Sequence, residues 1–172
     1  LAITDTDFSR ELGPDYGSRH VARLPMWFVG GKPWLSRLVQ FPEGLSKAPF
    51  LLRMPDNPVR KEVDHFLWKR DLRPVIAAEL EDTNLIRAFL LKNEGIAAMD
   101  LLSVSTDFRA KRLFKLHPDP LPFVQNVWFL FRRHHRDEPV LQKSLDIIRD
   151  TFHLTVPMGA KTGANTRPRR RA

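Results

Sequence analysis

Apolar and polar residues alternate in blocks that predict a strand, a helix and a second strand in the middle of the chain. Val75–Leu80 is an apolar, partly β-branched run, which is typical of a buried strand. Asp82 and Thr83 have side chains that favour a helix N-cap, and Gly95 supplies the usual C-terminal stop. Between them, apolar side chains recur at helical spacing, at Ile86, Phe89 and Leu90. Ile96–Val104 is again mostly apolar, so the segment predicts a β-α-β unit and a parallel sheet covered by helices.

The same criteria place further strands and helices on both sides of this unit. The predicted strands are Leu1–Thr4, Leu24–Val29, Phe50–Met54, Leu113–Leu116 and Phe123–Phe131, the last being apolar enough for a central strand buried on both faces. The predicted helices run through Trp34–Leu38, from an Asn57 cap to a point before Arg73-Pro74, and over Val140–Phe152. In the second helix, the predicted buried stripe is Val59, Val63, Phe66 and Leu67, and the residues predicted to face water are Arg60, Lys61, Glu62 and Lys69. Ser105–Lys111 is a polar stretch for which no helix or strand is predicted.

Length and composition exclude several classes of site. The chain has 172 residues, enough for one well-buried domain or two small lobes, and 42% of them are hydrophobic, as in a globular protein. It contains no cysteine, which removes disulfides, thiolate nucleophiles and cysteine-based zinc sites. No apolar run approaches the roughly 18 residues that cross a bilayer, and the N-terminus has no basic segment followed by an apolar core. We therefore expect a soluble, cytoplasmic protein.

The net charge of +8 is distributed unevenly. Five positive charges and no acidic residue lie beyond Gly159, so the body of the chain to Met158 carries only +3. Val156–Ala172 has no apolar period, which predicts a basic disordered tail. Arg132–Arg136 and Arg167–Arg171 could contact nucleic acid phosphates, or could be a solvated strand end and a disordered terminus. The chain also starts inside an apolar strand without a methionine, so we expect a C-terminal fragment of a longer protein.

Three predicted strand-to-helix turns are candidate ligand contacts: Gly30-Gly31-Lys32, Met54-Pro55-Asp56-Asn57 and Asp82-Thr83-Asn84. In a parallel sheet these turns lie along the same carboxyl edge, where ligands bind. Free N–H groups at helix N-termini suit a carboxylate or another polar ligand, whereas Asp56 and Asp82 would attract a cation. The predicted effector-binding residues at these turns are Gly30, Gly31, Met54, Pro55, Asp56, Asp82, Thr83 and Asn84. The alternative is that Asp56, Asp82 and Thr83 only cap their helices.

Motifs for catalysis or metal binding are missing from the sequence. Gly30-Gly31-Lys32 lacks the GxxxxGK[ST] spacing of a phosphate loop and predicts a tight turn. His134 and His135 are adjacent, so on a strand they point to opposite faces, and no HExxH motif is present. No G-x-S-x-G elbow occurs, and no serine has a recognisable base partner. We therefore predict no catalytic residue, no metal site and no cofactor, and a protein that is not an enzyme.

The order of the segments resembles a known family. The segments that carry the resemblance are Leu1-Ala2-Ile3-Thr4-Asp5, Ala78–Asn84 leading to Gly95-Ile96-Ala97-Ala98, and Phe129–Arg133 followed by the last helix. Over Leu1–Phe152 they resemble the effector-binding, or substrate-binding, domain of LysR-type transcriptional regulators. Glu79–Phe89 is most similar to the branch that activates sodium/proton antiporter genes. The chain departs from the family at Asn93-Glu94-Gly95, where two glycines are common, and at Met99-Asp100, which a proline often occupies.

The resemblance implies an α/β, two-lobed fold like that of type II periplasmic binding proteins, with one lobe complete and the other partial. Residues 1–5 would be a strand of the first lobe and the first crossover, and residues 6–112 would be the second lobe. Residues 113–155 would be the second crossover and the return to the first lobe, followed by the basic tail at 156–172. The resemblance also adds Thr4 and Asp5, at the first crossover, to the candidate effector contacts.

The function implied by the resemblance is that of a ligand-sensing regulatory domain. Such a domain binds a small-molecule or ion effector in the cleft between its lobes and controls an upstream winged helix-turn-helix domain that binds DNA. The family usually pairs these domains, so a homodimer or tetramer without membrane contact is implied. Two alternatives are a solute-binding protein of a transport system and a basic nucleic-acid-binding module that acts through the tail.

Overall fold

The computed structural model describes residues 2–38 and 40–155. Its strands are β1 (Ala2–Thr4), β2 (Tyr16–Gly30), β3 (Pro49–Arg53), β4 (Val75–Leu80), β5 (Ile96–Asp100), β6 (Phe114–Lys115) and β7 (Val124–Arg132). Its helices are α1 (Lys32–Arg37), α2 (Pro58–Trp68), α3 (Thr83–Leu91), α4 (Leu101–Arg109) and α5 (Pro139–Thr155), with two short 3₁₀ segments at Glu43–Lys47 and Arg133–His135. None of the helices in this part of the chain is long and apolar enough to span a membrane. The predicted tail at 156–172 lies outside the described residues.

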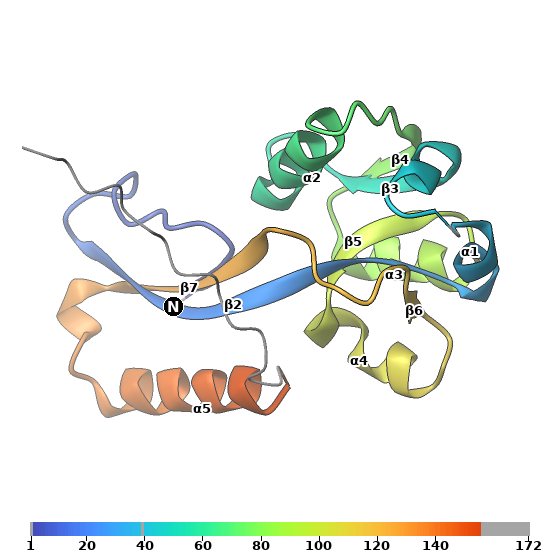
Figure 1. The fold of residues 1–172 in the computed structure, drawn as a ribbon. Coiled ribbons are helices and arrows are strands. Elements are labelled where there is room, and N and C mark those ends of the chain that lie inside the picture. Colours follow the sequence, from blue (N-terminus) through green and yellow to red (C-terminus); the bar gives the residue numbers. More distant parts are fainter. Residues whose placement is uncertain (1, 39, 156–172) are drawn as a thin grey trace, which may run out of the picture.

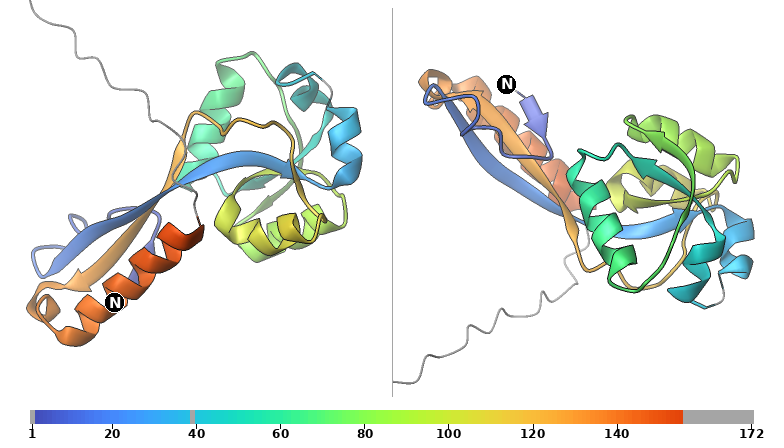
Figure 2. Two further views of the ribbon diagram at one scale, coloured as in Figure 1. Left: turned by 60° about the horizontal axis from the view of Figure 1, so that its bottom comes forward. Right: turned by 90° about the horizontal axis from the view of Figure 1, so that it is seen from above.

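Two bodies of unequal size are joined by a ribbon of two long strands (Figure 1). In this ribbon β2 pairs antiparallel with β7, from Tyr16 opposite Arg132 to Pro25 opposite Val124. The smaller body contains β1, β7, the first part of β2 and α5. The larger body contains the last part of β2, strands β3 to β6 and helices α1 to α4, as the two views of Figure 2 show. One strand, β2, therefore belongs to both bodies.

The strand order is β1-β7-β2-β5-β3-β4, and β6 pairs with β2. Strands β3, β4 and β5 are parallel, and β3 lies between the other two, so the crossover from β4 through α3 to β5 passes over β3. This confirms the predicted β-α-β unit. However, β2 pairs antiparallel with β5, β6 and β7. The expectation of a parallel sheet is therefore confirmed for β3, β4 and β5 and wrong for β2, because the chain enters the larger body along β2 against the direction of β5.

Each face of the larger sheet has its own apolar core, because successive side chains of a strand point to opposite faces. In β5, Ile96 and Ala98 pack on the face covered by α2, whereas Ala97 and Met99 pack on the face covered by α3 and α4. The predicted stripe of α2 is confirmed, since the buried members of its face are Val59, Val63, Phe66 and Leu67. In the smaller body, the central strand β7 packs on α5 through Phe129, Phe131, Leu141 and Leu145.

The segment after β5 folds differently from the sequence prediction. The predicted strand Ile96–Val104 ends at Asp100, and most of the polar stretch Ser105–Lys111 belongs to helix α4, which the sequence analysis did not predict. Asp100 starts this helix, because its side chain accepts a hydrogen bond from the Ser103 N–H at 2.9 Å. Apolar side chains then recur at helical spacing, at Leu101, Val104 and Phe108. The sequence analysis missed this short helical period, because Leu101 and Val104 had been assigned to the strand Ile96–Val104 and the residues after them are mostly polar.

Helix α3 ends at an asparagine instead of the predicted glycine. Asn93 adopts the left-handed conformation with a φ of 64°, which asparagine tolerates better than most residues. Gly95 has a different role, since a Cβ atom there would lie 2.5 Å from the carbonyl oxygen of Pro49. The glycine therefore allows β5 to approach the start of β3 closely.

A buried carboxylate ties α3 to the end of α4. Asp107 is fully buried, and its Oδ2 atom lies 2.5 Å from Nε of Arg87. Its Oδ1 atom accepts hydrogen bonds from Nη2 of Arg87 at 3.0 Å and lies 2.7 Å from Nη2 of Arg112. A buried charge is tolerated only when it is paired in this way. Arg87 and Arg112 are 31% and 52% exposed, so water can solvate their charges, whereas within the described residues the charge of Asp107 is compensated only by these two ion pairs.

We expect Asp107→Ala to lower the free energy of unfolding by about 3 kcal/mol, because it leaves two arginines without their shared counter-ion and a hole beneath α4. Arg112→Ala should cost less than about 1 kcal/mol, because Arg112 is half exposed and Arg87 still pairs with Asp107. Urea denaturation followed by circular dichroism measures both values. Equal losses in the two variants would contradict the assignment of Asp107 as the centre of the cluster.

Candidate functional site

A cavity of about 590 Å³ opens between the smaller body and the N-terminal end of α2. The loop after β1 forms one wall, and the turn from β3 into α2 forms the other, together with the residue after β4. The lining residues are Asp5, Thr6, Phe8, Glu11, Met54, Asp56, Asn57, Pro58, Lys61 and Glu81. In the right panel of Figure 2, the loop after β1 approaches α2 across this opening. Both bodies line the cavity, and clefts between domains are common ligand sites.

The wall supplied by the larger body follows from the parallel strands. Arg53, the last residue of β3, pairs with Leu80, the last residue of β4. Strand β5 is also parallel to β3 and ends at the same edge with Asp100. Each strand leads into a helix, and the N-caps of α2, α3 and α4 are Asn57, Asp82 and Asp100. Three helix N-termini therefore gather at one edge, as expected for a sheet of this kind.

Three predicted site residues line the cavity directly: Asp5, Met54 and Asp56. Thr4 lies just before them, and its hydroxyl donates to the Thr6 carbonyl oxygen at 2.6 Å. Pro55 is exposed in the same turn as Met54 and Asp56. Asn84 contributes its backbone N–H, which donates to Oδ1 of Asp82 at 2.6 Å.

Gly30 and Gly31 lie away from this cavity. Gly30, at the end of β2, pairs with Ile96, the first residue of β5, so it lies at the opposite edge of the sheet from Asp56 and Asp82. Gly31 packs against Asn93, whose Oδ1 atom would lie 1.8 Å from an added Cβ. The prediction that all three turns share one edge is therefore wrong for these glycines. The physical reason is the antiparallel pairing of β2 with β5.

The capping alternative holds for Asp82 and fails for Asp56. The side chain of Asp82 accepts the Asn84 N–H at the start of α3. In α2 the cap is Asn57, whose Oδ1 atom accepts from the Val59 N–H at 2.9 Å. Asp56 is exposed and lines the cavity, so its carboxylate is available to a ligand.

Arg53 is a polar residue of this edge that the sequence analysis missed. Its Nη1 atom donates to the Glu81 carbonyl oxygen at 2.9 Å, and its Nη2 atom donates to the Thr83 hydroxyl. Within the described residues, its buried Nε atom has no hydrogen-bond partner. Burial lowers the pKa of Arg53 from its usual value, because it disfavours the charged form of the guanidinium. The negative charges of Asp5, Asp100 and Asp82 favour that charged form and so oppose the shift. The sequence signal for this role was the position of Arg53, a charged residue near the end of an otherwise apolar predicted strand.

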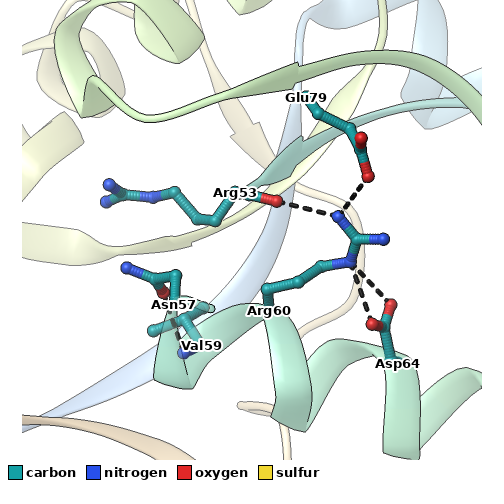
Figure 3. Close-up of polar contacts among 6 residues, drawn as sticks. All are labelled: Arg53, Asn57, Val59, Arg60, Asp64 and Glu79. Atoms are coloured by element: carbon teal, nitrogen blue, oxygen red, sulfur yellow. Dashed lines mark hydrogen bonds and ion pairs between the residues drawn. The ribbon is translucent and has the colours of Figure 1, made fainter. Parts of the chain in front are cut away.

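A second arginine fixes α2 against the sheet (Figure 3). Arg60 was predicted to face water, but it is only 9% exposed. Its Nη1 atom donates to the carbonyl oxygen of Arg53 at 2.9 Å and to Oε1 of Glu79 at 2.5 Å. Its Nε atom lies 2.9 Å from both carboxylate oxygens of Asp64. Charge-assisted hydrogen bonds of this kind hold their partners firmly, so the first turn of α2 is a fixed wall of the cavity.

The cavity lining has an excess of negative charge. Four carboxylates contribute to it, from Asp5, Glu11, Asp56 and Glu81, whereas Lys61 is its one positively charged lining residue. Phe8 and Met54 add partly exposed apolar surface, at 37% and 39% exposure. In the part of the chain that the structure describes, no group of three or more histidine or acidic residues is arranged to hold a metal ion. The geometry suits recognition of a polar ligand by charge and hydrogen bonding.

The family described as the LysR substrate binding domain matches residues 1–153. A comparison with curated proteins gives no match.

Solved structures of LysR-type regulators share the fold of this chain. The regulatory domain of CrgA from Neisseria meningitidis is similar with a TM-score of 0.61 and 14% identity, over 80% of this chain and 69% of that one. The AmpR effector-binding domain from Citrobacter freundii gives a TM-score of 0.64 and 12% identity, over 82% and 70% of the two chains. The CcmR regulatory domain from Synechocystis, solved in complex with 2-PG, gives 0.61 and 14%, over 85% and 70%.

These similarities confirm the predicted α/β, periplasmic-binding-protein-like fold. At such low identity the solved structures establish the fold, and the family assignment comes from the match over residues 1–153. The chain therefore belongs to the LysR substrate-binding domain family, the effector-binding domains of LysR-type transcriptional regulators.

Proposed function

We propose that this domain senses a small-molecule or ion effector in the cavity between its two bodies and passes the signal to a winged helix-turn-helix domain that binds DNA. The observation that carries the proposal is the cavity itself, which both bodies line. A ligand that contacts both walls binds one relative arrangement of the bodies better than another, and it shifts the population by that difference in affinity. CcmR, a relative in fold, was solved with 2-PG, which supports a ligand-binding role without identifying the ligand here.

The proposed effector contacts are Thr4, Asp5, Met54, Pro55, Asp56, Asp82, Thr83 and Asn84, with Asn57, Lys61 and Glu81 added from the cavity lining. The acidic lining favours a ligand with a positive charge or with several hydrogen-bond donors, because Asp56 and Glu81 are exposed carboxylates. Phe8 and Met54 can cover an apolar part of the same ligand.

We also propose the finer assignments made from the sequence. The Glu79–Phe89 segment supports the branch that activates sodium/proton antiporter genes, and a transcriptional role supports a cytoplasmic location. Family membership favours a regulator over a solute-binding protein of a transport system. Arg167–Arg171, on which the nucleic-acid-binding alternative depends most, lies outside the described residues.

The ligand proposal is tested by thermal unfolding of the protein across a panel of metabolites and cations. A ligand that binds the folded state raises the midpoint of unfolding. Asp56→Asn and Glu81→Gln should each weaken binding of that ligand about tenfold, which corresponds to about 1.4 kcal/mol. Asp119→Asn, a change at an exposed aspartate outside the cavity, serves as the matched control. Unchanged affinity in both cavity variants would show that the ligand binds elsewhere.

A second surface supports a homodimer. Strand β4 is at one end of the strand order, so one of its edges is unpaired within the described residues. Trp68 at the end of α2 is 77% exposed, and Val75 and Ile76 of β4 are 56% and 49% exposed. Exposed apolar side chains beside a free strand edge are typical of an association surface. We propose that a second copy of the domain covers this surface, in a dimer or in a tetramer built from dimers.

Trp68→Glu and Ile76→Lys should each weaken self-association about tenfold or more, because a buried charge replaces an apolar contact. Sedimentation equilibrium over a range of protein concentrations measures the dimer dissociation constant. Leu35→Glu places a charge at an exposed leucine on α1, which follows β2, and strands β5 and β3 separate β2 from β4; this change should leave self-association unchanged. A dimer that persists equally in all three variants would exclude the β4 edge.

A further inference from the structure

A side-chain hydrogen bond joins the two walls of the cavity between the bodies. Nδ2 of Asn57, at the start of α2, donates to Oδ2 of Asp5, in the loop after β1, at 3.2 Å. Both residues line the cavity, so the bond is part of the proposed ligand site. It links a residue of the smaller body to a residue of the larger body that are 52 positions apart in the chain.

The Asn57 amide has two partners on two different elements. Its oxygen accepts the Val59 N–H and caps α2, while its nitrogen reaches Asp5. The helix that it caps is fixed to β3 and β4 through Arg60, so Asn57 has little freedom to follow Asp5 if the bodies move. Figure 3 shows Asn57 and Arg60 on this first part of α2. The bond to Asp5 therefore depends on the relative position of the bodies.

The carboxylate side of the bond is also held electrostatically. Asp5 is close enough to Arg53 to oppose the lowering of the Arg53 pKa, which shows an attraction between the two charges. Oδ1 of Asp5 accepts a hydrogen bond from the Thr6 hydroxyl at 3.2 Å, which orients Oδ2 toward Asn57. The smaller body thus presents a carboxylate to an amide donor and a guanidinium of the larger body.

The connection between the bodies is narrow. Its covalent part is the ribbon of β2 and β7, as Figures 1 and 2 show, and α5 of the smaller body also contacts α4 of the larger body. The pairing register of this ribbon shifts between His20 and Ala22, which marks a β-bulge. Bulges bend a strand and increase its local twist. A two-stranded joint with a bulge leaves the relative orientation of the bodies dependent on the contacts between them, which include those of α5 with α4 and those across the cavity.

We propose that the hydrogen bond between Asn57 and Asp5 is a latch that holds the two bodies in the arrangement of this structure, which we call closed. A hydrogen bond to a charged group shifts a two-state equilibrium by roughly tenfold to a hundredfold. The latch sets how readily the cavity opens, and thereby regulates ligand access. The role in ligand access rests on the proposed function, whereas the effect of the hydrogen bond on the arrangement of the two bodies does not.

The absence of cysteine from the sequence allows a direct measurement, because two introduced cysteines are the sole labelling sites. Lys69→Cys, directly after α2, and Lys143→Cys on α5 replace exposed lysines, one in each body. Spin labels at these positions report the distance between the bodies by pulsed electron paramagnetic resonance. No added ligand is needed, so the result is independent of the effector screen.

Asn57→Asp keeps an oxygen that caps α2 but replaces the donor with a second carboxylate facing Asp5. In the labelled protein it should shift the closed-to-open ratio about tenfold toward a longer and broader distance distribution. Asp5→Ala should have a similar effect. The double variant Asp5→Asn/Asn57→Asp exchanges donor and acceptor, and it should restore the original distribution.

Urea unfolding of each variant checks that α2 remains capped and the domain folded. An Asn57→Asp distribution identical to that of the unsubstituted domain would overturn the latch. A folded double variant that stays open would overturn it too, because the exchanged pair can form the same hydrogen bond. If the latch is confirmed but the cavity variants Asp56→Asn and Glu81→Gln leave ligand affinity unchanged, the proposed function fails and the conformational inference stands.

Discussion

The direction of β2 constrains the rest of this structure. This strand pairs with β7 in the smaller body and then with β5 and β6 in the larger one, antiparallel in every case. It therefore enters the larger sheet against β5, while β3 and β4 run parallel to β5. The ends of these three parallel strands share one edge, and that edge faces the loop after β1. The cavity has walls from both bodies because β2 contributes to the joint between them and also sets the orientation of the larger sheet.

Charged side chains organise the edge that faces the cavity. Arg60 is buried and joins α2 to β3 and β4, which makes the first turn of α2 a fixed support. Arg53 joins the end of β3 to the turn before α3 through Glu81 and Thr83. The carboxylates that remain exposed in the cavity then give it a negative character. This division matters physically, because paired charges stabilise the fold whereas unpaired ones are available to a ligand.

The proposed function combines an interbody cavity with a two-stranded joint. In this proposal a ligand changes the relative arrangement of two bodies on the ribbon of β2 and β7, and a DNA-binding domain detects that change. The hydrogen bond between Asn57 and Asp5 belongs both to the cavity lining and to the contact between the bodies. In the proposal it therefore affects ligand binding as well as the relative position of the bodies. Sensing and mechanical response would then use the same few side chains.

The sequence by itself determined most elements, because capping residues and apolar periods are local: Asn57 and Pro58 start α2, Asp82 starts α3, and the central strand β7 is a nearly continuous apolar run. It also placed Asp5, Met54 and Asp56 among the candidate contacts, and the tertiary structure brings these three together. Only the tertiary structure decided that Gly30 and Gly31 lie at the opposite edge, since strand direction depends on pairing between segments distant in sequence. The same reason applies to Arg53 and Arg60, whose roles come from partners on other strands and turns that local periodicity does not reveal.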